Sequence, residues 1–325
     1  NKAFRYVLSY YDCFTGKRIS KKLIGIKNNI KDGAKDTMHF KHKKLLNPPI
    51  MRAAYSDRMA WLMAEMSKLA YLKFEDDTEK LKKALSLADF ELVEIFNKAG
   101  TQAFLAKRYL DKIMVLAFRG TEVKEPRDIL TDLNAKFYND DKGIKIHNGF
   151  NKAFELVKQE VIDVVGKIEN FSLYVTGHSL GGALALIATK TLNSDNLAAC
   201  YTFGSPRVGN EEFDDEIKPP IYRVVNAFDI VPSVPPEYLF EIINLLPWKW
   251  SKNLAKKFIG YAHHGDMRYL TDCKDFPKVK LISNYNEFFR LVGLWKNKKE
   301  SVKHHEINIY CEKLAQYALK RLIIK

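Results

Sequence analysis

A glycine-rich turn at residues 177–182 is the feature that most constrains how this chain folds. Its sequence is GHSLGG; it follows the apolar run 173–175, and a helix pattern rich in Ala and Leu begins directly after it. Side chains at the glycine positions would collide with the tight turn and with the crossing helix. The order of strand, sharp turn and helix therefore predicts that Ser179 lies on a strained turn that lifts its hydroxyl clear of a sheet.

Strand and helix patterns alternate on both sides of this turn. Ser56 is a candidate N-cap for a helix whose apolar residues recur at spacings of three and four. Strands are predicted over 90–96, 102–108, 112–118, 173–176, 198–202 and 221–226, and helices over 76–88, 149–168, 180–192 and 303–323. Such alternation predicts an α/β fold in which a mostly parallel central sheet is flanked by helices.

Residues 1–50 differ from the rest of the chain. Aromatic and β-branched residues at 4–11 and 19–26 flank a turn at Thr15-Gly16-Lys17, which is typical of a β-hairpin, and a Lys-rich stretch and Pro48-Pro49 follow. We therefore expect a small β-rich appendage and linker over 1–50, and one α/β domain over 51–325.

The distribution of charge suggests an anionic partner. The formal net charge is +14 at pH 7, and the basic residues are concentrated in 1–50 and 245–325, while the middle of the chain is mildly acidic. A lipid headgroup surface and a nucleic acid are both anionic. No nucleic-acid-binding motif is recognisable, so nucleic acid is not expected.

A serine hydroxyl becomes a good nucleophile only when a base removes its proton. In α/β-hydrolases the acid and then the histidine follow the serine along the chain. Of the eight histidines, this order leaves His263, His264, His304 and His305 as candidate bases. Asp229 is the best candidate for the acid because it comes just after the predicted strand 221–226, at the edge where catalytic groups collect.

Several ordered segments of the chain resemble the class 3, fungal-type, lipase family. They span roughly residues 56–320 and comprise FRGT at 118–121, DILTDL at 128–133, HNGF at 147–150, GHSLGG at 177–182, YTFGSPRVGN at 201–210, RVVN at 223–226 with DIVP at 229–232, and a histidine-glycine segment at 263–265.

The resemblance implies an α/β-hydrolase fold and assigns roles to single residues. Ser179 is the expected nucleophile, Asp229 the expected acid and His305 the expected base, with His304 as the alternative base. Backbone N–H groups of Leu180 and Thr121 are expected to form the oxyanion hole. No metal or cofactor is expected, and the four cysteines have no C-x-x-C spacing.

Two segments bear on the substrate. In the family, the stretch after FRGT forms a lid helix; here 122–137 carries the apolar residues Ile129, Leu130, Leu133 and Phe137, and a buried helix is the alternative interpretation. Residues 238–261 combine aliphatic residues with Trp248, Trp250 and four lysines, a composition typical of a helix lying in a bilayer surface. Together with the basic ends, they favour peripheral contact with an anionic membrane.

The predicted function is a serine carboxylester hydrolase that acts on lipids at a membrane or droplet surface, most nearly of the phospholipase A1 type. A triacylglycerol lipase is the alternative substrate class. A lipase-like binding scaffold without activity is the alternative from another class, although such a scaffold has no need for all three triad residues. The appended N-terminal piece favours a secreted or translocated protein over a cytoplasmic one.

Overall fold

The computed structural model describes residues 6–11, 18–23, 38–49, 54–121, 137–139, 143–235, 260–273, 275–297 and 300–323. The chain divides into two compact units, Asn1–Met38 and His39–Lys325. In the first unit, β1 (Tyr6–Tyr11) and β2 (Arg18–Leu23) form the antiparallel hairpin that the sequence predicts.

The boundary between the units lies nearer the N-terminus than the expected division at residue 50. Phe40 and Leu45 are fully buried in the core of the second unit, and Phe40 packs edge-on against Trp61. The backbone N–H of Phe40 donates to the buried Glu65 carboxylate at 3.2 Å. Residues 39–49 are therefore part of the α/β unit rather than a linker to it.

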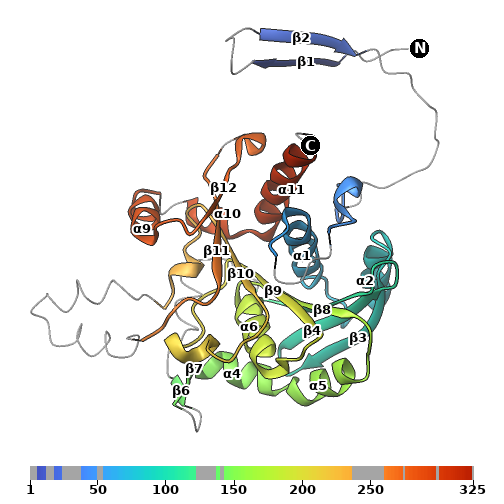
Figure 1. Cartoon of the computed structure of the whole chain (residues 1–325), viewed down its shortest axis with the longest axis vertical. Helices are drawn as coiled ribbons and strands as arrows, with labels where there is room; N and C mark the ends of the chain where they lie inside the picture. Colours follow the sequence, from blue (N-terminus) through green and yellow to red (C-terminus); the bar gives the residue numbers. More distant parts are fainter. Residues whose placement is uncertain are drawn as a thin grey trace, which may run out of the picture. The chain divides into compact units, whose positions relative to one another are not determined.

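An eight-stranded sheet forms the centre of the second unit (Figure 1). Its strand order is β12-β11-β10-β9-β8-β5-β4-β3, and the five strands from β5 to β11 are parallel, while β3, β4 and β12 are antiparallel to their neighbours. The strands are β3 (Glu91–Lys98), β4 (Thr101–Arg108), β5 (Ile113–Phe118), β8 (Ser172–His178), β9 (Leu197–Phe203), β10 (Ile221–Asn226), β11 (Asp266–Leu270) and β12 (Leu281–Ser283).

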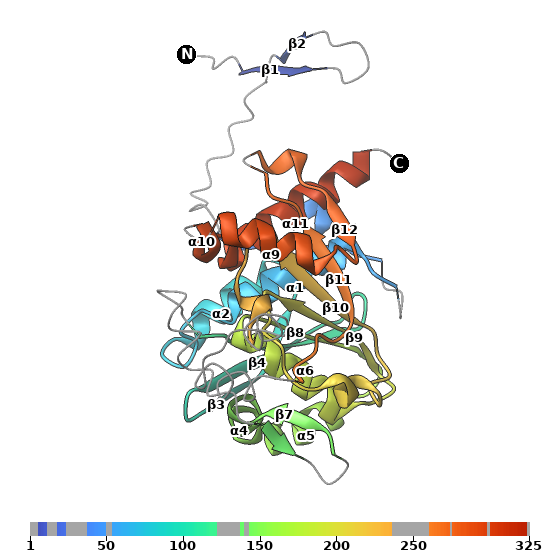
Figure 2. The ribbon, with the colours of Figure 1, turned by 90° about the vertical axis from the view of Figure 1, so that its left-hand side faces the viewer.

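Helices cover both faces of the sheet, as Figure 2 shows in a view turned by 90°. Alternate residues of β5 enter two separate apolar clusters: Val115 packs on the face covered by α1, α2 and α11, and Leu116 packs on the face covered by α4, α5 and α6. The helices are α1 (Asp57–Leu69), α2 (Thr78–Ser86), α4 (Asn148–Glu155), α5 (Lys158–Gly166), α6 (Leu180–Leu192), α9 (Glu287–Lys296), α10 (Ser301–His305) and α11 (Ile307–Ile323). The predicted α/β fold with a mostly parallel, helix-flanked sheet is confirmed.

A second, short ribbon consists of β6 (Phe137–Asn139) and β7 (Lys145–His147), which pair antiparallel. The helix expected over 149–168 is two helices, α4 and α5, separated by Leu156 and Val157. Within the described parts of the chain, no helix is both long enough and apolar enough to cross a bilayer.

Candidate active site

Ser179 occupies the sharp turn between β8 and α6. Its backbone dihedrals are φ +57° and ψ −130°, a conformation that L-residues rarely adopt. The flanking glycines allow the backbones of β8, α6 and the end of β5 to approach closely at this turn. A Cβ on Gly177 would lie 2.1 Å from the Gly181 carbonyl oxygen, and a Cβ on Gly181 would lie 2.3 Å from the Phe118 carbonyl oxygen. The strained turn places Ser179 at the first position before the N-terminus of α6.

Three residues from separate parts of the chain meet at this serine. His305, the last residue of α10, has its Nε2 2.9 Å from Ser179 Oγ, and its Nδ1 lies 2.9 and 3.0 Å from the two carboxylate oxygens of Asp229. Because a carboxylate only accepts, Nδ1 carries the proton, and the Nε2 lone pair is left to accept from the serine hydroxyl. The exposed fractions of the serine, histidine and aspartate are 2%, 6% and 0%.

The Asp229 carboxylate is held from three directions. Besides His305, it accepts from the backbone N–H of Val231 at 2.9 Å and from the Tyr310 hydroxyl at 2.5 Å. The Tyr310 oxygen in turn accepts from the Asn226 N–H at 3.1 Å. Burial, together with the charge of Asp229, raises the pKa of Tyr310 well above its ordinary value, so this hydroxyl remains a donor.

Gly204 lies against the acid and the base, where a side chain would not fit. Its φ is +55°, and a Cβ there would lie 2.5 Å from Asp229 Oδ2, 3.0 Å from the Tyr310 hydroxyl and 3.1 Å from His305 Nδ1. The sequence segment 201–210 contains this glycine, but nothing in the sequence alone indicates that its missing side chain makes room for the acid and the base.

His178 supports the base from behind. Its Nε2–H donates to the His305 carbonyl oxygen at 2.6 Å, and its Nδ1 lies 2.8 Å from the Tyr71 hydroxyl. Burial, and secondarily the facing His305, hold the pKa of His178 well below its ordinary value, so this ring is neutral. Tyr71 and the role of His178 were not foreseen from the sequence, because the three residues lie more than a hundred positions apart.

The adjacent His304 points elsewhere. Its ring packs edge-on against Phe228, and its Nε2 lies 3.8 Å from carboxylate oxygens of Asp272 and of Glu300. Its carbonyl oxygen accepts from the side-chain amide of Asn226 at 2.8 Å. The structure therefore brings His305, and not His304, to the serine.

The other two candidate histidines also pair away from Ser179. His264 Nδ1 lies 3.0 Å from Asp214, and His263 Nε2 lies 3.6 Å from Glu287. Asp214 is thus the partner of a buried imidazole. Within the part of the chain that the structure describes, no three His, Cys, Asp or Glu side chains lie together as a metal site requires.

The expected oxyanion-hole residues flank the serine. Leu180 is the first residue of α6, where backbone N–H groups have no partner within the helix and the helix dipole is positive. Thr121 is exposed and follows Gly120, whose Cβ, if present, would lie 3.2 Å from that of Ser179. Arg119 forms a structural ion pair: its guanidinium donates to the Glu75 carboxylate at 2.6 and 2.7 Å and lies over the Phe74 ring.

Most candidates for lipid contact lie outside the described residues. This holds for Ile129, Leu130 and Leu133 and for Trp248 and Trp250. Phe137, expected at the end of a lid helix, begins strand β6 instead, and its ring stacks on Tyr261 with centroids 4.1 Å apart.

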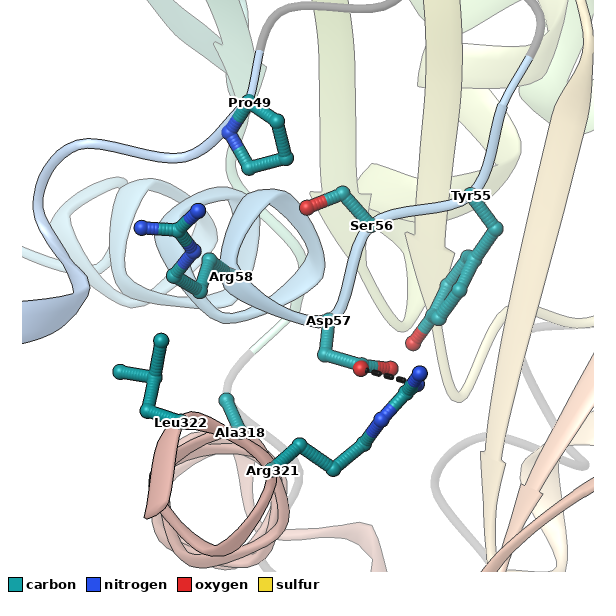
Figure 3. Close-up of a pocket in the computed structure, with 8 residues that line it drawn as sticks. All are labelled: Pro49, Tyr55, Ser56, Asp57, Arg58, Ala318, Arg321 and Leu322. Atoms are coloured by element: carbon teal, nitrogen blue, oxygen red, sulfur yellow. Dashed lines mark hydrogen bonds and ion pairs between the residues drawn. The ribbon is translucent and has the colours of Figure 1, made fainter. Parts of the chain in front are cut away.

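A separate pocket lies between the N-terminal end of α1 and the C-terminal end of α11 (Figure 3). An ion pair between Asp57 and Arg321, 2.6 Å long, closes one side of it, and Tyr55 points toward that pair. The triad residues lie in the turn after β8, in the loop after β10 and at the end of α10, so this pocket belongs to another part of the fold.

A strained serine turn on a mostly parallel sheet, with its histidine and carboxylate supplied later in the chain, defines an α/β-hydrolase. Comparison with known proteins agrees. Residues 115–239 match the family model Lipase (class 3). This part of the chain is similar to class 3 lipases, which have the α/β-hydrolase fold seen here.

Two curated relatives illustrate the similarity. A secreted mono- and diacylglycerol lipase of Fusarium solani is 35% identical over 149 residues, which are 43% of this chain and 44% of that protein. A chloroplastic phospholipase A1-Igamma3 of Arabidopsis thaliana is 33% identical over 210 residues, covering 51% of this chain and 38% of that protein. The chain thus spans less than half the length of these relatives.

Among solved structures, one described as "A serine protease triad forms the catalytic centre of a triacylglycerol lipase" superposes with a TM-score of 0.54. It is 25% identical, and the match covers 72% of this chain and 87% of that chain.

Proposed function

We propose that this chain is a serine carboxylester hydrolase that acts on lipids through Ser179, His305 and Asp229. The observation that carries the proposal is the continuous hydrogen-bonded series from Ser179 Oγ through the His305 ring to the Asp229 carboxylate, with every distance between 2.9 and 3.0 Å. Such a series supplies both the base and the orientation that a serine nucleophile needs. A binding scaffold without activity has no use for it.

The geometry dictates the order of proton transfers. As Ser179 Oγ forms a bond to the ester carbonyl carbon, its proton passes to His305 Nε2, and the carbonyl oxygen becomes an oxyanion facing the N–H groups of Leu180 and Thr121. The imidazolium then gives this proton to the leaving alcohol oxygen as the C–O bond breaks. Water then attacks the acyl carbonyl carbon while the same nitrogen takes its proton, and the imidazolium returns that proton to Ser179 Oγ as the bond to the acyl group breaks and the fatty acid leaves. Asp229 orients the ring and stabilises the imidazolium throughout.

We propose a glycerophospholipid as the substrate, cleaved in the manner of a phospholipase A1, with a triacylglycerol as the alternative. The net charge of +14 supports attraction to an anionic bilayer, and the similarity to a plant phospholipase A1 supports the same class. On α9, which packs beside the Asp229 loop, Phe289 is 63% exposed and Val292 is also exposed. Apolar side chains exposed near the site suit contact with a lipid surface.

We also propose that the protein acts outside the cytoplasm, which its similarity to a secreted fungal lipase supports.

Fatty-acid release from anionic phospholipid vesicles, measured beside a triacylglycerol emulsion, tests this proposal. Ser179→Ala is the blank, and Ser86→Ala, an exposed serine of α2, is the control that should retain full activity. A fluorophosphonate, which labels activated serines, should modify the wild-type chain at Ser179 only.

Release from vesicles that disappears in Ser179→Ala supports the phospholipase assignment, whereas release from the emulsion alone would make the chain a triacylglycerol lipase. If neither substrate is cleaved and Ser179 resists the fluorophosphonate, the hydrolase proposal is wrong and the binding scaffold takes its place.

A further inference from the structure

Three buried arginines surround one carboxylate next to the catalytic acid. Arg223 Nη1 lies 3.1 Å from Glu287, Arg207 Nη2 lies 3.6 Å and Arg290 Nη2 lies 3.7 Å from the same carboxylate. None of the three side chains is more than 9% exposed. The arginines come from the loop after β9, from β10 and from α9, so this arginine cluster ties three elements together.

Burying three guanidinium groups beside one another is costly. Removing a guanidinium from water costs several kcal/mol unless partners replace the water. The cost appears in the pKa of Arg223, which burial lowers to about 10, and in that of His263, which burial and the arginines hold well below its ordinary value.

Arg290 extends from the arginine cluster to the loop that carries the acid. Its Nη1 donates to the backbone carbonyl of Asp229 at 2.9 Å, and its Nη2 donates to Ser233 Oγ at 2.6 Å. One planar guanidinium therefore holds both ends of the five-residue loop 229–233. Two parallel donors in a fixed plane fix the orientation of the loop as well as its position.

We propose that Arg290 is the residue that positions Asp229, and that Glu287 and the other arginines hold Arg290 in place for this purpose. This inference rests on the proposed hydrolase function. Arg290 is 1% exposed and bonds the aspartate through its main chain, so it acts on the reaction through Asp229 and does not touch the lipid.

The position of Asp229 matters because its carboxylate accepts from His305 Nδ1 and so fixes the orientation of the His305 ring. Without the guanidinium, the Asp229 carbonyl and Ser233 Oγ would lose a charged donor each, and the loop could shift while the Val231 and Tyr310 bonds persist. A displacement of about 1 Å at a catalytic group is enough to cost about 100-fold in rate.

Arg290→Gln is the primary test, with vesicle hydrolysis as the assay. We expect kcat to fall by about 10- to 100-fold, while KM stays within about twofold because no contact with substrate is lost. Arg290→Lys should recover part of the loss, since an ammonium can reach one of the two acceptors. Ser233→Ala, which removes only one of these acceptors, should lower kcat by a smaller factor.

Arg108→Gln is the matched control. Arg108 is also 1% exposed, it bonds the Asp111 carboxylate at 2.5 and 3.0 Å, and it donates to the Ala88 carbonyl, but it lies at the end of β4 away from the triad. Its loss should lower the melting temperature as much as the Arg290 variant does and leave kcat unchanged. If both variants reduce kcat equally, Arg290 has only a general structural role and the inference is overturned.

A spectroscopic readout separates this inference from the proposed function. The proton on His305 Nδ1, which is shared with Asp229, gives a downfield proton resonance that disappears in His305→Gln. In Arg290→Gln and Ser233→Ala, this resonance should shift or broaden, and in Arg108→Gln it should not. An unchanged resonance with unchanged kcat refutes the positioning role, whereas wild-type protein that resists fluorophosphonate and cleaves no lipid refutes the hydrolase.

Discussion

At the scale of single residues, the site depends on an absent side chain as much as on those present. The Asp229 carboxylate, the Tyr310 hydroxyl and the His305 ring all lie within 3.1 Å of the place where a Cβ on Gly204 would be. Gly204→Ala should therefore displace the acid or the base and lower kcat by at least about 100-fold. A positive φ adds about 1–2 kcal/mol of backbone strain to that variant.

The chain offers a matched glycine for comparison. Gly100, in the turn between β3 and β4, has φ +89° and no atom within 4 Å of its Cβ position. Gly100→Ala should thus lose stability through backbone strain and keep its kcat, as measured by vesicle hydrolysis and thermal melting of both variants. Equal kcat values for Gly204→Ala and Gly100→Ala would mean that the groups around Gly204 can move to admit a methyl group without disturbing the triad.

At the scale of elements, the sequence predicts which strands and helices exist better than where they break. Local patterns suffice for the Ser179 turn and for Asp229 at the end of β10, because each depends on residues adjacent in the chain. The helix predicted over 303–323 is in fact two, α10 and α11, joined at Glu306, whose backbone is extended (φ −60°, ψ 125°). His305 reaches Ser179 at this break. Long-range packing fixes the break, so the sequence alone left His304 and His305 as alternatives.

The N-terminus of α4 leads to a prediction about pH. His147 is the N-cap of α4: its Nδ1 accepts from the Phe150 N–H at 3.3 Å, and its ring stacks on that of Phe150. Burial lowers the pKa of His147 to about 4, against 6.5 in the unfolded chain. Below pH 6.5 the unfolded chain takes up a proton that the folded chain refuses, so the free energy of unfolding should fall as the pH drops from 6.5 to 4, by at most about 3 kcal/mol.

Urea unfolding at a series of pH values measures this dependence. His147→Asn keeps a side-chain acceptor at the cap without a titrating ring, so its unfolding free energy should vary less over this pH range. His39, whose pKa burial also lowers to about 4, should contribute a similar share. A His147→Asn curve parallel to that of the wild type would show that the imidazole is protonated in the fold.

At the scale of the whole molecule, the boundary between the two units decides what the α/β unit needs in order to fold. Composition separates residues 1–50 from the rest, because Lys-rich, Pro-containing sequence is typical of linkers. It does not reveal that Phe40, Leu45 and Leu46 close the core over α1, since three apolar residues in a basic stretch have no periodicity. Arg58 adds a bond from α1 to the carbonyl of Asn47, 2.8 Å long.

Two truncations test whether residues 39–49 belong to the core of the α/β unit and whether that unit folds without the hairpin unit. A chain of residues 39–325 keeps every contact of the second unit, so its melting temperature and its labelling by a fluorophosphonate should match those of the full chain. A chain of residues 51–325 loses three buried apolar side chains and leaves the buried Glu65 without the Phe40 N–H, and should be less stable by about 5 kcal/mol or more. Phe40→Ala in the full chain should reproduce about 3–5 kcal/mol of that loss. If the 39–325 chain melts as early as the 51–325 chain, then the hairpin unit supports the core and the division at Met38 does not mark an independent fold.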